Sequence, residues 1–159
     1  MREQLKKRTV YLCGAINGRT NEECIDWRER VKGLLDCPTI DPMARDFRGR
    51  EQDEVVTIIE NDKADIDACD FLLVNYMGPS VGTSMEILYA WERGKAVILV
   101  TPPGTVLSPW LLYHKHKLFF TLEDAAAYIN DNCLLDPQPA ENFGELEELV
   151  DRNNTLVKS

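Results

Sequence analysis

The sequence has little positive charge, few histidines and no long apolar run, and each shortage excludes a class of function. Its 159 residues carry 18 Lys and Arg against 27 Asp and Glu, a net charge of −9. That balance disfavours attraction to a nucleic-acid polymer or an anionic membrane. The apolar stretch near the N-terminus, Val10–Cys13, is far too short for a signal peptide or a membrane span. We expect one α/β domain over residues 1–135 and an acidic extension over 136–159.

The cysteines and histidines do not form a metal-binding or redox motif. No C-x-x-C pair occurs, and His114 and His116 have no carboxylate cluster beside them, so we expect no metal and no cofactor. The odd number and wide spacing of the cysteines favour reduced thiols in a cytoplasmic protein. The five residues are Cys13, Cys24, Cys37, Cys69 and Cys133.

Short apolar segments alternate with segments of helical periodicity along the chain. The expected strands are 9–13, 38–41, 70–76, 96–101 and 118–121, and the expected helices are 21–35, 54–68, 85–93, 107–114 and 122–132. This alternation predicts an α/β fold, a flavodoxin-like or Rossmann-like doubly wound sheet of five parallel strands with helices on both faces. Functional sites in such sheets lie beyond the carboxyl ends of the strands. The polar segment 42–52 is expected to be a loop near that site.

Three loops should therefore converge: 14–19 (GAINGR), 78–84 (GPSVGTS) and the stretch around Ser108. In the second loop, small residues and hydroxyls precede a helix and leave backbone N–H groups free for an anionic oxygen. The loop is neither a Walker A motif nor G-x-G-x-x-G. It is a candidate phosphate cradle, or else a tight turn made by Gly78 and Gly82.

Glu86 is the one carboxylate in the apolar run 85–91 (MEILYAW), in what we expect to be the first turn of its helix. One interpretation is an exposed glutamate favoured by the helix dipole. The other is a nucleophile that attacks an anomeric carbon. A leaving group would then need a second carboxyl group, and spacing alone does not choose among four candidates. These are Asp62, Asp65, Asp67 and Asp70.

Taken together in their order, several motifs resemble one protein family. They are 11–18 (YLCGAING), Asn61-Asp62 ahead of Asp70, 80–86 (SVGTSME) and Leu107-Ser108. The sequence thus resembles the nucleoside 2-deoxyribosyltransferase superfamily over residues 9–130. Within it, the resemblance is strongest to the branch of 2'-deoxynucleoside 5'-monophosphate N-glycosidases.

The resemblance implies a role for each matching residue. Glu86 corresponds to the nucleophile, Asp62 to the aspartate that assists the departing base, and Tyr11 to a residue near the sugar and base. Ser108 would reach the site of the neighbouring subunit in a homodimer. The implied substrate-binding residues are Gly14, Ile16, Asn17, Gly18, Arg19, Ser80, Gly82, Ser84 and Ser108.

Ser80 is the position that separates the two branches. Transferases that act on free nucleosides carry an aspartate there, which would repel a phosphate, whereas a serine can donate a hydrogen bond to it. One difference points the other way, because the N-glycosidase branch often has an arginine where Asn17 stands. Arg19 is a candidate substitute for that positive charge.

The sequence therefore predicts an N-glycosidase that splits a (deoxy)nucleoside 5'-monophosphate into free base and sugar 5-phosphate. Its two carboxyl groups should lie about 5 Å apart if a covalent intermediate forms. One alternative is a deoxyribosyltransferase that exchanges bases, and another is a phosphoribohydrolase, which the G-T-x-x-E element at 82–86 resembles. Non-enzymatic alternatives are a nucleotide sensor and a structural interaction domain. The base, the sugar and the acceptor stay open.

Overall fold

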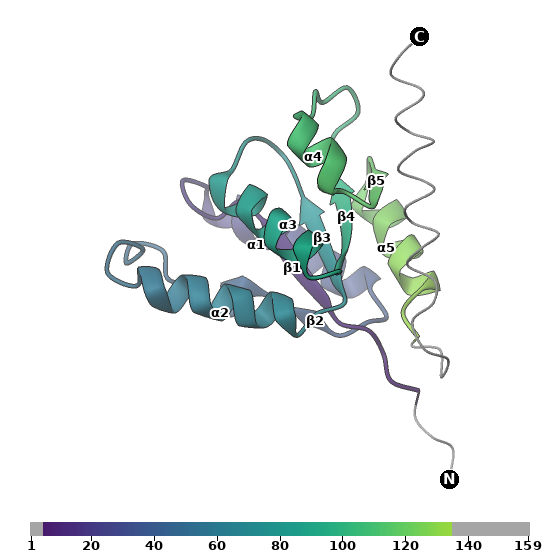
Figure 1. Ribbon diagram of the computed structural model, residues 1–159, viewed down its shortest axis with the longest axis horizontal. Helices are drawn as coiled ribbons and strands as arrows, with labels where there is room; N and C mark the ends of the chain where they lie inside the picture. Colours follow the sequence, from purple (N-terminus) through teal and green to yellow (C-terminus); the bar gives the residue numbers. More distant parts are fainter. Residues whose placement is uncertain (1–4, 135–159) are drawn as a thin grey trace.

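Five strands form one parallel sheet in the computed structural model, which describes residues 5–134 (Figure 1). The strands are β1 (Val10–Gly14), β2 (Thr39–Ile40), β3 (Phe71–Asn75), β4 (Ala96–Val100) and β5 (Lys117–Phe119). Their order is β2-β1-β3-β4-β5, which is the flavodoxin-like arrangement, and every pair is parallel. The predicted fold class is confirmed. The expected acidic extension, 136–159, lies outside the described residues.

Helices cover both faces of this sheet. They are α1 (Asn21–Leu34), α2 (Val55–Asp67), α3 (Val81–Glu92), α4 (Pro109–His114) and α5 (Leu122–Asp131), with a short 3-10 turn, η1 (Pro42–Ala44). Val31 of α1 and Ile129 of α5 share one core cluster. Ile66 of α2, Ile87 of α3 and Leu111 of α4 share the other. Among the described residues, no helix is long and apolar enough to cross a membrane.

Strand β1 serves both cores because successive side chains of a strand point to opposite faces. Val10 and Leu12 pack into the cluster under α1 and α5. Tyr11 and Cys13 pack into the cluster under α2 and α3. All four side chains are fully buried. The strand therefore delivers a phenol and a thiol to one face and only hydrocarbon to the other.

Helix α3 begins earlier than the sequence predicts. Ser80 is its N-cap and accepts a hydrogen bond from the Thr83 amide at 3.3 Å, so the helix starts at Val81 rather than Met85. A capping serine satisfies one of the free amides of the first turn and offsets the poor helix propensity of Gly82. Glu86 consequently lies in the second turn, beyond the turn where the helix dipole acts most strongly.

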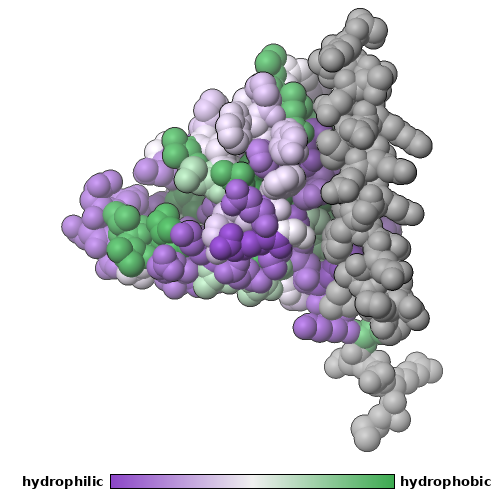
Figure 2. All heavy atoms as spheres, in the orientation of Figure 1, coloured by the Kyte–Doolittle hydropathy of each residue, from purple (hydrophilic) through white to green (hydrophobic). Residues whose placement is uncertain are grey.

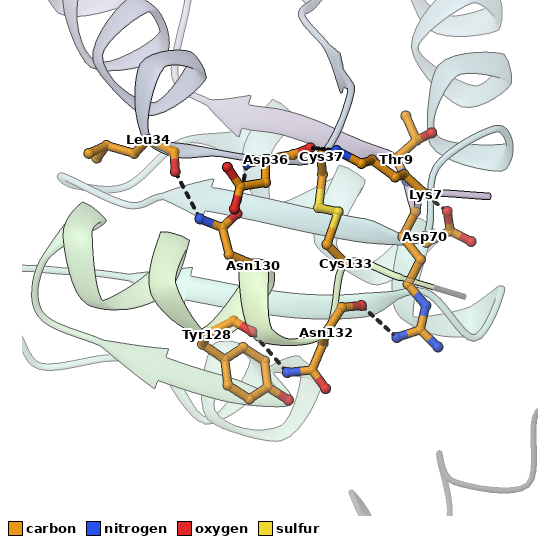
Figure 3. The surroundings of a disulfide bond; sticks show 11 residues. Lys7, Thr9, Leu34, Asp36, Cys37, Asp70, Tyr128, Asn130, Asn132 and Cys133 are labelled. Carbon is orange, nitrogen blue, oxygen red and sulfur yellow. Dashed lines mark hydrogen bonds between the residues drawn. A yellow bond between two sulfur atoms is a disulfide. The ribbon is translucent and has the colours of Figure 1, made fainter. Parts of the chain in front are cut away.

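Two of the cysteines are joined, which contradicts the expectation of five reduced thiols. Cys37 and Cys133 form a disulfide with their Cα atoms 5.8 Å apart (Figure 3). Around it, the Asn130 side chain of α5 donates to the Leu34 carbonyl and accepts from the Asp36 amide. The pairing was invisible in the sequence because 96 residues separate the two cysteines and only the fold brings the ends of α1 and α5 together. Cys13, Cys24 and Cys69 are free and buried.

Candidate active site

A cavity of about 830 Å³ opens where the connections from β1 and β3 diverge to opposite sides of the sheet. Ligands bind at such switch points in open α/β sheets. The loop after β1, the segment 42–51, α2 and the start of α3 line the cavity. Much of its wall is apolar, with Met43, Phe47, Val55, Ile58 and Ile59 among the lining residues. The expected position of the site and the expected role of segment 42–52 agree with this placement.

Glu86 lies on the cavity wall with both carboxylate oxygens held by strand β1. The Tyr11 hydroxyl donates to Oε1 at 3.0 Å, and the Cys13 thiol donates to Oε2 at 2.9 Å. These donors are two residues apart on the strand and therefore point to the same face. The interpretation of Glu86 as an exposed surface glutamate is wrong, because the residue is only partly exposed and both its carboxylate oxygens accept hydrogen bonds from β1.

Burial shifts the pKa values of Glu86 and Tyr11. Burial raises the pKa of Glu86 to about 7, against the lowering effect of the hydrogen bonds from Cys13 and Tyr11. The negative charge of Asp62 also raises that pKa, and the Arg28 guanidinium lowers it. Burial, followed by the charge of Glu86, raises the pKa of Tyr11 far above its ordinary value. Tyr11 therefore stays protonated and remains a donor to the carboxylate.

Asp62 lines the same cavity from α2. Burial raises the pKa of Asp62 to about 6, while the nearby Arg45 lowers it and Asp65 raises it. Arg45 itself is ion-paired with Asp65. Of the four candidate aspartates, Asp62 alone is among the residues that line this cavity, and its role stays a prediction. The cavity thus holds two carboxyl groups with raised pKa values.

The loop after β1 is shaped by close packing beneath it. A Cβ at Gly14 would lie 2.8 Å from a ring atom of Trp27, so a larger residue would displace the loop. Arg28 is fully buried and donates to the carbonyls of Leu12 and Gly14 at 3.4 and 3.0 Å. Sequence reasoning missed Arg28, because an arginine in an amphipathic helix is typical of an exposed position.

The predicted substrate-binding residues divide into two groups. Five of them line the cavity: Gly14, Ile16, Asn17, Ser80 and Gly82. The other four, Gly18, Arg19, Ser84 and Ser108, are not among its lining residues. Gly18 adopts a φ of +73° in the turn after β1, and Arg19 lies 3.9 Å from Glu23.

The hydroxyls near α3 and α4 have distinct environments. Ser84 is exposed and donates to the Ser80 carbonyl at 2.8 Å. Ser108 is exposed and caps α4, so its predicted contribution to a neighbouring site stays a prediction. Thr83, by contrast, lines the cavity and is only 3% exposed. Within residues 5–134 its hydroxyl has no hydrogen-bond partner.

Several cavity residues were not predicted from the sequence. The cations Arg45, Arg48 and Lys63 line the cavity, although segment 42–52 was expected to lie near it. In an acidic sequence, the positive charge of these three residues was the signal that could have identified them. Residues 5–134 contain no group of three His, Cys, Asp or Glu side chains arranged to hold a metal ion.

Comparisons with known proteins point to one family. A family model for nucleoside 2-deoxyribosyltransferases matches residues 10–146. The 2-deoxyribosyltransferase of Bacillus psychrosaccharolyticus superposes with a TM-score of 0.64 at 18% identity, covering 76% of this chain and 95% of that one. The 2-deoxyribosyltransferase of Leishmania mexicana gives 0.57 at 20%, covering 78% and 97%. The CMP N-glycosidase of Clostridium botulinum gives 0.53 at 16%, covering 79% and 99%.

These similarities in structure concern the fold, since all three identities are low. No curated protein matched the chain. The family match, in contrast, spans most of the sequence and includes β1, α2 and α3, the elements that carry Tyr11, Asp62 and Glu86. The chain is an enzyme that belongs to the nucleoside 2-deoxyribosyltransferase family.

Proposed function

We propose that this enzyme is an N-glycosidase that cleaves a (deoxy)nucleoside 5'-monophosphate to free base and sugar 5-phosphate. The observation that carries the proposal is the Glu86 carboxylate, held on the cavity wall by Tyr11 and Cys13. Asp62 faces the same cavity from α2. A positioned carboxylate and a second carboxyl group of raised pKa are the parts that a retaining glycosidic displacement requires.

In the first step, a carboxylate oxygen of Glu86 forms a bond to C1' of the sugar while the C1'–N bond breaks. The bonding electron pair leaves with the base, and Asp62 supplies the proton that neutralises it. The product is an ester between Glu86 and the sugar. Water then attacks C1', Asp62 takes up the proton of that water, and the ester bond breaks to regenerate the Glu86 carboxylate.

Both steps depend on the protonation of the two carboxyl groups. Glu86 must be ionised to attack, and Asp62 must be protonated to assist the leaving base. Burial places the pKa of Glu86 at about 7 and that of Asp62 at about 6. Because interacting carboxyl groups titrate as a pair, we expect a bell-shaped rate profile with its maximum between these two values.

The 5'-phosphate is assigned to the start of α3. Ser80 stands where an aspartate would repel a phosphate. Thr83 lines the cavity close by, and its buried hydroxyl has no hydrogen-bond partner within residues 5–134. The first-turn amides of a helix attract anions. Arg45, Arg48 and Lys63 are lining cations that can contact a phosphate, and in this structure Arg45 and Arg48 are ion-paired with Asp65 and Asp46. Because the wall also carries several carboxylates, the phosphate would be held by local contacts and not by a net positive charge of the cavity.

A homodimer belongs to the proposal. Ser108 is exposed and does not line the cavity of its own subunit. Beside it, Val106 and Trp110 are 94% and 71% exposed, which is unusual for such apolar side chains unless another surface covers them.

Light scattering should give twice the mass of the chain, and Trp110→Arg should give the monomer with weaker nucleotide binding. A wild-type monomer of full activity would remove the dimer from the proposal.

The test is a panel of nucleosides and their 5'-monophosphates, incubated with and without an acceptor base and analysed by chromatography. We expect base and sugar 5-phosphate from the monophosphates without any acceptor. Ser80→Asp should shift the preference toward the nucleoside. Turnover that requires an acceptor base would instead indicate a transferase, and binding without base release would indicate a sensor.

A further inference from the structure

Building on the proposed function, we propose that Cys13 is a positioning residue for the reaction, whose thiol holds one oxygen of the Glu86 nucleophile. Its role is to keep the carboxylate in the single orientation that faces the sugar. Nothing in the sequence alone distinguishes this cysteine from the other four. The contact with Glu86 does so.

The geometry is that of a two-point clamp. The Cys13 thiol is 2.9 Å from Oε2 of Glu86, and the Tyr11 hydroxyl is 3.0 Å from Oε1. Both donors are fully buried on β1, which is one of the two strands that flank the switch point. A carboxylate fixed at both oxygens cannot rotate about its terminal bond without losing one of the two hydrogen bonds. Tyr11 alone would leave that rotation free.

The chemistry of a thiol suits this position. A thiol is a weak hydrogen-bond donor, whereas a phenol or an alcohol is a stronger one. A weak donor fixes the orientation of the carboxylate while withdrawing little of the electron density that attacks C1'. The clamp thus combines a strong donor on one oxygen with a weak donor on the other.

The charges around Glu86 define what the loss of the thiol should do. Tyr11 and Cys13 bond to it from β1, while Asp62 on α2 and Arg28 on α1 act on it through their charges. The hydrogen bond from Cys13 lowers the pKa of Glu86, and the charge of Asp62 raises it. Burial and the charge of Glu86 raise the pKa of the Cys13 thiol, so it keeps the proton that it donates.

Cys69 provides a matched control. It is a free, buried thiol in the same core cluster as Cys13. It follows α2 rather than β1, and within the described part of the chain the side-chain donors to Glu86 are Tyr11 and Cys13. Cys69→Ala removes the same sulfur atom from the same core. That sulfur interacts with the backbone of Tyr11, but the two side-chain hydrogen bonds to Glu86 come from Tyr11 and Cys13 and stay in place.

The experiment measures Glu86 in two ways in the wild-type protein, Cys13→Ala, Cys13→Ser and Cys69→Ala. The first is a carbon-13 NMR titration of the Glu86 carboxyl group without substrate, assigned with Glu86→Gln. The second is the pH dependence of kcat and KM for base release. A hydrogen bond worth about 1 kcal/mol corresponds to roughly 0.7 pH units.

For Cys13→Ala we expect the Glu86 titration to move up by about 0.5 to 1 pH unit. Because the pKa of Glu86 lies above that of Asp62, the alkaline limb of the rate profile should move up with it, and kcat should fall about tenfold while KM changes little. Cys13→Ser should move the titration down and recover most of kcat, since its hydroxyl can hold the same oxygen. Cys69→Ala should match the wild-type protein in both measurements.

A folded Cys13→Ala protein with an unchanged Glu86 titration and unchanged kcat would overturn the role of Cys13 and leave the proposed function intact. If Cys13→Ala fails to fold, Cys13→Ser decides, and an unshifted titration in that variant overturns the role. Absence of base release from the wild-type protein would overturn the proposed function itself. The two failures are therefore distinguishable.

Discussion

The two faces of the sheet use the same strand for opposite purposes. Under α1 and α5, β1 contributes Val10 and Leu12 to a closed apolar core, and the disulfide joins the ends of these two helices. Under α2 and α3, the same strand contributes Tyr11 and Cys13, which hold a carboxylate. One face is thus packed with hydrocarbon, whereas the other accepts buried polar groups beside the candidate active site.

The second face of the sheet, the one under α2 and α3, is also less completely covered than the first. Val55, Val56 and Ile59 of α2 are 52%, 75% and 46% exposed. Hydrophobic residues gather over the N-terminal end of α2, at the left of the molecule in Figure 2. Val81 and Met85 of α3 are exposed as well. This face retains apolar surface that a ligand or a second subunit can bury.

Burial of the Glu86 carboxyl group on the second face lowers the free energy of unfolding at neutral pH. A glutamate in an unfolded chain ionises near its ordinary pKa of 4.5, whereas burial raises the folded-state pKa of Glu86 to about 7. Between these values the unfolded state releases the proton and the folded state keeps it. Glu86 therefore makes the free energy of unfolding fall as the pH rises from about 4.5 to 7, with no further loss above that range.

Replacing the nucleophile should give the largest effect and separates activity from stability. Glu86→Gln should reduce kcat by about 10⁴-fold, because no carboxylate remains to attack C1'. The same variant should gain roughly 1–3 kcal/mol in the free energy of unfolding at pH 8 and nothing at pH 4.5, since no charge is left to bury. Base-release kinetics and urea titrations at the two pH values measure this. A loss of stability at pH 8 would contradict the assigned cost.

Replacing the second carboxyl group should give the next largest effect. Asp62→Asn should lower kcat by about 10²–10³-fold, since the departing base loses its proton donor. The falling alkaline limb of the rate profile should disappear, leaving only the rising limb that reports ionisation of Glu86. Asp67→Asn is the matched control on the same helix, because its side chain pairs with Tyr89 and Arg93 and does not line the cavity, and it should stay within about threefold of the wild-type rate. If the Asp62→Asn variant kept the alkaline limb, a group other than Asp62 would be the donor of the proton to the departing base.

Opening the disulfide should affect only the first face. Cys37→Ser should lower the free energy of unfolding by about 2–4 kcal/mol, because the bridge closes a long loop in the unfolded chain. The values of kcat and KM should be unchanged in the folded protein, because the disulfide lies at the ends of α1 and α5. Denaturant titration under oxidising conditions measures the loss. Equal stability of the variant and the wild-type protein would mean that the bridge contributes nothing.

A small change in the closed core should have the smallest effect. Ile129 of α5 is fully buried in the cluster under α1 and α5. Ile129→Val should cost about 1 kcal/mol by removing one buried methylene group, with base release unaltered. Thermal unfolding and the rate assay check the two parts. A change in kcat would show that the two faces are coupled through β1.

The sequence was sufficient for the fold because hydrophobic patterning and breaker residues are local signals. Apolar runs such as 96–101 and the glycine at 94, which adopts a φ of +70° after α3, mark the elements directly. The edge strand β2 was harder to place and is only two residues long, within the predicted 38–41. The start of α3 was misplaced because the Ser80 cap overrides the low helix propensity of Gly82.

The site was only partly predictable, because its decisive contacts join residues far apart in the sequence. Motif resemblance identified Glu86, Asp62 and Tyr11. It assigned no role to Cys13, which lies 73 residues from the glutamate that it contacts. The buried guanidinium of Arg28 and the pairing of Cys37 with Cys133 also depend on tertiary placement. Residue type alone carries no information of that kind.

The most direct test of the central claim is the mass of the protein during turnover. The enzyme is mixed with a deoxynucleoside 5'-monophosphate, quenched in acid within milliseconds to seconds, and digested for mass spectrometry. A retaining displacement predicts a deoxyribose 5-phosphate ester on the peptide that contains Glu86, formed in the wild-type protein and absent in Glu86→Gln. Base release by Glu86→Gln at nearly the wild-type rate, with no ester in either protein, would contradict the claim that Glu86 is the nucleophile.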